Sequence, residues 1–187
     1  MTKRRVGLTL TRDVAGAAAV EMALVLPLLL LLMFGAFELG HYFYSEHVIQ
    51  KAVRDGARYA ARQPMGRFVS AGGTGTGCRA TPEDPVTATT RNLVRTGQVA
   101  AGGSSRIAGW TDPATITLSV ACFTTADGEA MSGIYSGMAY GVSSTAVGAP
   151  VITVTAAVPY MSLFGTLGLP EPSLTLNARS QAAVMGI

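Results

Sequence analysis

The sequence predicts an α+β fold, on the strength of two patterns. An apolar run over residues 17–37 passes into an amphipathic stretch that reaches residue 63, and together they predict one long N-terminal helix. Three later segments alternate apolar and polar residues, as strands with one buried face do. We therefore expect a long helix, first transmembrane and then amphipathic, packed on a small antiparallel β-sheet.

The chain then divides into four parts. We expect residues 1–16 to form a basic cytoplasmic leader, residues 17–40 a transmembrane helix, residues 41–63 an amphipathic helical extension, and residues 64–187 an exported α+β domain. What remains of the 187 residues after the long helix has room for one modest domain.

The apolar run is long enough to cross a bilayer. At about 1.5 Å per residue it measures about 31 Å, against a hydrocarbon core of about 30 Å. A cleaved secretory signal is the first alternative, but its apolar core is only about 7–15 residues long, and no A-x-A site follows the run here. We expect a retained anchor that crosses the inner (cytoplasmic) membrane once.

Charge sets the expected orientation of this anchor. Residues 1–16 hold four of the 14 basic residues and one of the 11 acidic residues, so the positive-inside rule keeps them in the cytoplasm. The C-terminal domain is then periplasmic or extracellular. Since the rest of the chain is formally neutral, we expect no nucleic-acid binding through a basic surface.

Within the apolar run, Pro27 lacks the N–H group that would reach the carbonyl of Ala23. We expect a helix kink there, which either weakens the helix for extraction from the bilayer or has no function.

Residues 16–40, GAAAVEMALVLPLLLLLMFGAFELG, resemble the class III, type IV prepilin-like signal of pilins and pseudopilins. In that family a prepilin peptidase cuts on the cytoplasmic side of the apolar helix, after a glycine, and leaves glutamate as the fifth residue of the mature chain. The resemblance implies a cleavage site between Gly16 and Ala17, which makes Glu21 the fifth residue.

Residues 52–61, AVRDGARYAA, resemble the amphipathic motif of TadE-like proteins, the pseudopilins of tight-adherence (Flp/Tad) pilus systems, and residues 150–185 loosely resemble that family's ending. The resemblance implies a pilin-like layout and a minor pseudopilin that acts in pilus assembly and adhesion. The implied partners are the prepilin peptidase, other pilin or pseudopilin subunits and an inner-membrane assembly platform, in a hetero-oligomeric assembly that can include the surface pilus.

Two alternatives to this function stay open. One is an uncleaved, membrane-anchored exported binding or scaffold protein, which would keep Met1. The other is a secreted product, whose chain would begin beyond Phe37.

Glu21 is the only acidic residue of the apolar run. A carboxylate at hydrocarbon depth costs roughly 2.5–3.5 kcal/mol on insertion scales, so it usually has a function and a partner. In a bundle of staggered subunits, the α-amine of Ala17 in one copy could meet Glu21 of its neighbour and set the register. Alternatively, Glu21 extends to water at the cytoplasmic interface.

The amphipathic stretch predicts a buried helix face and a charged one. Lys51, Asp55 and Arg58 are spaced for ion pairs on the wet face, and Pro64 ends the helix at Gln63. The expected buried face comprises Tyr42, Ile49, Val53, Gly56 and Ala60.

The exported part adds a short helix and three strands. Thr81 and Pro82 predict the start of the helix, and Gly97 its end. The glycine-rich residues 72–77 and 128–148 are expected to be loops. The expected inward faces of the strands are Ile116, Leu118, Val120 and Cys122; Ile152, Val154, Ala156 and Val158; and Leu174, Leu176 and Ala178.

Cys78 and Cys122 are the only cysteines. Export makes a disulfide between them plausible, and two free thiols are the alternative. We expect no metal site, because His41 and His47 are six residues apart on one helix. No catalytic motif occurs, and no histidine follows His47, so we expect neither an enzyme nor a cofactor.

Overall fold

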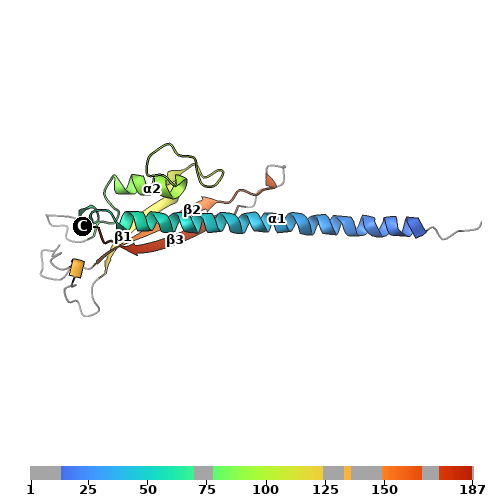
Figure 1. Ribbon diagram of the computed structural model, residues 1–187, viewed down its shortest axis with the longest axis horizontal. Coiled ribbons are helices and arrows are strands. Elements are labelled where there is room, and N and C mark those ends of the chain that lie inside the picture. The colour runs from blue at the N-terminus through green and yellow to red at the C-terminus, as the bar shows by residue number, and fades with distance from the viewer. Residues whose placement is uncertain (1–13, 70–77, 124–132, 136–148, 166–172, 187) are drawn as a thin grey trace, which may run out of the picture. The chain divides into compact units, whose positions relative to one another are not determined.

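Helix α1 runs from Val14 to Ala61 and is the longest element of the chain (Figure 1). The computed structural model describes residues 14–69, 78–123, 133–135, 149–165 and 173–186. The chain separates into two compact units, Met1–Gly40 and His41–Ile187.

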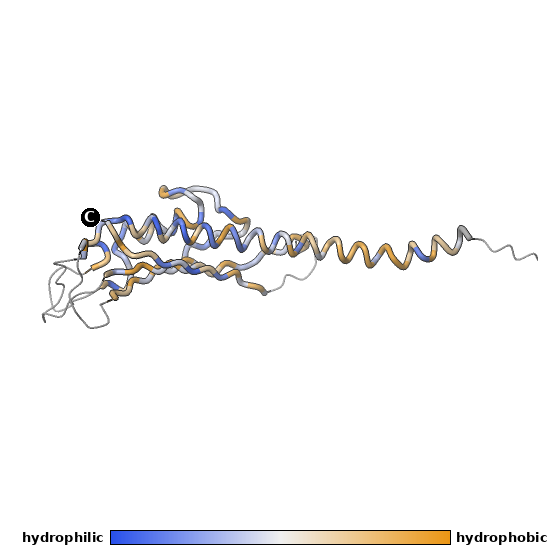
Figure 2. Tube along the Cα trace, turned by 60° about the horizontal axis from the view of Figure 1, so that its bottom comes forward, coloured by the Kyte–Doolittle hydropathy of each residue, from blue (hydrophilic) through white to orange (hydrophobic). Residues whose placement is uncertain are grey.

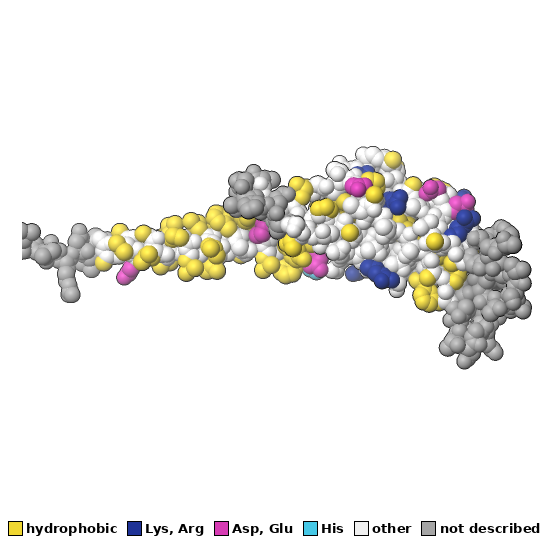
Figure 3. Space-filling view, turned by 180° about the vertical axis from the view of Figure 1, so that it is seen from behind, with side chains coloured by type: hydrophobic (Ala, Val, Ile, Leu, Met, Phe, Trp, Pro, Cys, Tyr) yellow, Lys and Arg dark blue, Asp and Glu magenta, His cyan; other side chains and the backbone are white. Residues whose placement is uncertain are grey.

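In the first unit, α1 is apolar apart from Glu21 and Glu38, and it exposes most of its side chains (Figures 2 and 3). Among the described residues, α1 is the one helix that is long and apolar enough to cross a membrane, with a mean hydropathy of 2.4 in its most apolar window and none of that window buried. Helical structure continues on both sides of Pro27. The hydrogen bond that this proline removes therefore does not end the helix.

The second unit contains a three-stranded antiparallel sheet in chain order. Its strands are β1 (Ile116–Phe123), β2 (Ala149–Pro159) and β3 (Thr175–Ala183). In the register of the sheet, Ala156 of β2 lies between Ile116 of β1 and Ala178 of β3, so the apolar residues expected on one face share that face. Leu174 is the exception: it precedes β3 and is exposed.

This sheet face packs with the second half of α1 in one hydrophobic core. Alanines dominate the helix side, which allows the helix backbone to approach the sheet closely. Trp110 completes the core from the segment before β1, and its indole Nε1–H donates to Thr115 Oγ1 at 2.8 Å. The helix residues in the core are Ile49, Ala52, Val53, Ala57, Ala60 and Ala61.

Helix α2 (Val86–Thr96) is the short helix that the sequence predicts, but the expected start at Thr81 and Pro82 is wrong. The segment before Val86 uses its backbone for bonds to another part of the chain: Glu83 N–H donates to the Arg67 carbonyl at 2.8 Å. At the other end, Gly97 has a φ of +82° and its N–H donates to the Leu93 carbonyl. Only the C-terminal signal is therefore confirmed.

Three short 3₁₀ turns connect these elements: η1 (Met65–Arg67), η2 (Pro113–Thr115) and η3 (Gly133–Tyr135). The expected loop over residues 72–77 lies outside the described residues. So does the expected loop over residues 128–148, apart from η3.

The segment after β3 closes the end of α1. Helix α1 ends at Ala61, just before the expected Gln63, and the Ala61 carbonyl accepts the N–H of Met185 at 2.8 Å. Next to this bond, Gly186 pairs with Pro64 in an isolated parallel bridge, and Val184 is fully buried. Residues from opposite ends of the domain thus satisfy each other's backbone groups.

Candidate membrane anchor and assembly surface

The expected cleavage site lies in the first turn of α1. Gly16 and Ala17 are both exposed, and a Cβ atom on Gly16 would meet nothing within 4 Å. Within the described part of the chain, this peptide bond is therefore uncovered.

Glu21 lies four residues after Ala17, about one helical turn away, and is exposed on the first unit. Its neighbours Val20 and Met22 are exposed apolar side chains. The hydrogen bonds and ion pairs found among the described residues do not include Glu21. The carboxylate therefore lies on an apolar helix surface without a counter-charge from the described part of the chain.

The motif AVRDGARYAA, residues 52–61, serves to pack the helix in the second unit. Its small and apolar residues are buried, while Arg54 and Arg58 are exposed. A Cβ atom on Gly56 would overlap Cγ2 of Val94 and would lie 3.4 Å from Cγ2 of Thr90, both on α2. Glycine is therefore what lets α2 cross α1 at this point.

Asp55 of the same motif pairs differently from the expectation. Its carboxylate lies 3.7 Å from Nη2 of Arg106, which belongs to the segment after α2, and no ion pair with Lys51 or Arg58 is found among the described residues. Arg106 also donates from Nη2 to the Leu93 carbonyl and from its backbone N–H to the Arg95 carbonyl. The wet face of α1 is thus tied to the segment that follows α2, and spacing within the helix cannot show this.

A cluster of rings lies where the second unit begins. Nδ1 of His41 is 3.2 Å from the hydroxyl oxygen of Tyr160, within hydrogen-bond distance. The rings of Tyr42 and Tyr160 meet edge to face, with centroids 5.3 Å apart. The sequence places Tyr42 on the expected buried helix face but does not predict its contact with Tyr160. Four consecutive ring-bearing residues, HYFY at 41–44, are the signal for a cluster here.

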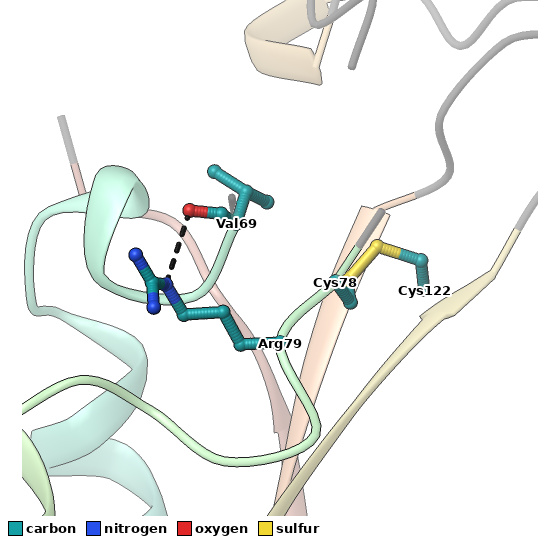
Figure 4. The surroundings of a disulfide bond; sticks show 4 residues. All are labelled: Val69, Cys78, Arg79 and Cys122. Carbon is teal, nitrogen blue, oxygen red and sulfur yellow. Dashed lines mark hydrogen bonds between the residues drawn. A yellow bond between two sulfur atoms is a disulfide. The ribbon is translucent and has the colours of Figure 1, made fainter. Parts of the chain in front are cut away.

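The two cysteines, Cys78 and Cys122, form a disulfide, with their Cα atoms 5.6 Å apart (Figure 4). Cys78 also pairs with Val69 in an isolated antiparallel bridge, and Arg79 Nε donates to the Val69 carbonyl at 3.3 Å. The bond therefore joins the end of β1 to the segment between η1 and α2.

A charged cluster lies near this disulfide. Glu83 accepts a hydrogen bond from Arg67 at 3.4 Å and lies 3.9 Å from Arg79. All three side chains are substantially exposed, so each pair is worth little to stability.

No group of three or more potential ligand residues that could hold a metal occurs within the ranges that the structure describes. His41 is engaged with Tyr160, as above.

Residues 16–58 match the family model for TadE-like proteins. The match begins at the glycine of the expected cleavage site, covers the exposed apolar part of α1 and ends inside the packing motif. It confirms the resemblance over this segment. Neither a curated protein nor a solved structure matches the chain.

Proposed function

From the TadE-like match at residues 16–58, we propose that this chain is a minor pseudopilin of a tight-adherence (Flp/Tad) pilus system. It is inserted in the inner membrane with residues 1–16 in the cytoplasm, is cleaved by a prepilin peptidase after Gly16, and acts in pilus assembly and adhesion. The observation that carries this proposal is the single match that spans both an exposed apolar helix and its buried amphipathic continuation. A soluble domain does not need the exposed apolar helix, and a simple membrane anchor does not need the buried amphipathic continuation.

The exposed apolar surface of α1 supports a role in assembly. Leu24 is 73% exposed and Leu31 is 68% exposed, so these side chains need lipid or another apolar helix around them. Lipid covers them before assembly, and the equivalent helices of other pilin subunits cover them in a fibre.

Apolar contacts alone do not fix how two neighbouring helices are aligned along their axes. The charge of Glu21 can fix this alignment. Cleavage after Gly16 creates an α-amine on Ala17, one turn from the carboxylate. In a staggered bundle, the amine of one subunit neutralises Glu21 of the next, and a shift by one turn would leave both charges unpaired.

The disulfide supports export of the second unit. Disulfides persist in oxidising compartments outside the cytoplasm, which agrees with a domain on the far side of the membrane from the leader. In this proposal, the partners are the prepilin peptidase at the leader, other pilin or pseudopilin subunits along α1, and an inner-membrane assembly platform.

N-terminal sequencing and intact mass test the proposal, on chain purified from membranes of cells with and without the prepilin peptidase. A mature chain that starts at Ala17 only when the peptidase is present supports a processed pseudopilin. A chain that starts at Met1 in both strains overturns processing and favours the uncleaved anchored binding or scaffold protein. A chain that starts beyond Phe37 shows a secreted product.

A further inference from the structure

The second unit begins with one complete helical turn of ring-bearing residues, His41, Tyr42, Phe43 and Tyr44. At 3.6 residues per turn, four consecutive side chains point to all sides of the helix. His41 and Tyr42 are half-buried against the domain, whereas Phe43 is 49% exposed and Tyr44 is 65% exposed. Three rings with polar atoms and one apolar ring, Phe43, therefore surround the helix directly after Gly40.

A second apolar segment lies at the same place in the domain. It follows β2 and is brought there by Tyr160, which is buried and contacts both His41 and Tyr42. The two residues after it that expose apolar side chains are Met161 and Leu163. Neither residues 41–44 nor residues 160–165 contain an acidic residue, a lysine or an arginine.

Such side chains are more favourably placed at a lipid–water boundary than in water. Tyrosine and other amphipathic rings concentrate at the boundary between lipid headgroups and acyl chains, where the ring is in an apolar layer and its polar tip is wet. An uncharged apolar surface that follows directly on a membrane-crossing segment is continuous with the lipid-covered surface of that segment.

We propose that residues 41–44 together with Met161 and Leu163 form an interfacial belt, which binds the headgroup boundary of the same bilayer that α1 crosses. The belt holds the exported domain directly on the membrane surface until the subunit is extracted. This proposal rests on the membrane anchor of the proposed function, and it adds a lipid contact made by the domain itself.

The other end of the sheet provides a matched control. Phe123 is also exposed, at 53%, but it pairs with Ala149 at the start of β2, whereas Tyr160 follows the end of β2. Eleven residues of strand separate these positions, which is roughly 36 Å at about 3.3 Å per residue. Phe123 therefore lies far along the sheet from the belt, and we expect it to stay in water.

Tryptophan fluorescence in bilayers of brominated phosphatidylcholine tests the belt. The full chain is reconstituted with single replacements Phe43→Trp, Leu163→Trp, Phe123→Trp and Leu30→Trp, and the emission of the wild type supplies the baseline for buried Trp110. All four replaced side chains are exposed, so the domain should fold, which circular dichroism and intact mass of the disulfide form verify.

With bromines near the headgroup end of the acyl chains, the belt predicts that Phe43→Trp and Leu163→Trp lose most of their added emission. Phe123→Trp keeps its added emission. Quenching of Leu30→Trp alone overturns the belt and leaves the anchor intact. With bromines placed deep in the acyl chains, no quenching at Leu30→Trp overturns the anchor of the proposed function, and the belt with it.

Discussion

Gly56 of α1 and Val94 of α2 are so close that any side chain on residue 56 would overlap the Val94 Cγ2 methyl group. Glycine is the least favourable residue for a helix interior after proline, at about 1 kcal/mol relative to alanine. Its presence inside the AVRDGARYAA motif is therefore explained by space and not by helix propensity. The crossing of the two helices depends on that space.

Gly56→Ala should lower the free energy of unfolding by about 1–3 kcal/mol, because the gain in helix propensity is smaller than the cost of overpacking. Denaturant unfolding of the detergent-solubilised chain measures this change. Gly66→Ala is the matched control, since a Cβ there meets nothing within 4 Å.

Val94→Ala should rescue Gly56→Ala in part, because it removes the overlapping methyl group. The double variant would then lose less stability than the sum of the two single changes. Additive losses would show that the two residues do not limit each other.

Replacement of both cysteines, Cys78→Ser with Cys122→Ser, should cost about 4 kcal/mol in the chain-entropy estimate for the 44-residue separation that the bond closes. Calorimetry of the domain's unfolding measures the loss. Reduction of the wild type should reproduce it, and an unchanged transition after reduction would show that the bond does not constrain the unfolded chain.

Gly186→Ala should detach the segment after β3 from the end of α1. A Cβ on Gly186 would overlap the carbonyl oxygen of Gln63, which is backbone and cannot rotate away. Hydrogen exchange at the Met185 amide should then accelerate, because its bond to Ala61 opens. Met185→Ala changes an exposed side chain and should leave exchange slow.

Glu21→Ala should reduce surface pili by at least roughly tenfold if the carboxylate pairs with a neighbouring α-amine, since an unpaired buried charge weakens each contact along the fibre. Electron microscopy and the sheared-fibre fraction measure the number of pili. Met22→Ala, at the adjacent exposed position, should leave that number unchanged. Normal pili with Glu21→Ala would exclude the register role.

Local patterns in the sequence predict the helices and strands of this fold, but they do not predict the contacts between elements that are distant in the sequence. The alternation in residues 116–122 and 152–158 depends only on one sheet face being buried, so it can be read without knowing what covers that face. The start of α2 could not be predicted in this way. Thr81 and Pro82 have the right residue types for a helix start, but the bond from Glu83 N–H to the Arg67 carbonyl holds that segment in another conformation.

The same limit applies to the candidate site. The expected cleavage and register residues follow a local signal around Gly16, whereas the pairing of Asp55 with Arg106 and the approach of Tyr160 to His41 join distant parts of the chain. His41 and Tyr160 are 119 residues apart, and no spacing rule connects them.

The hydrogen bond between Met185 and Ala61 joins a residue that is made early in synthesis to one that is made late. In the proposed topology, the carbonyl of Ala61 would cross the membrane before its partner, because the amide of Met185 is synthesised only after all three strands. The end of α1 therefore lacks this backbone partner until the segment after β3 has been synthesised.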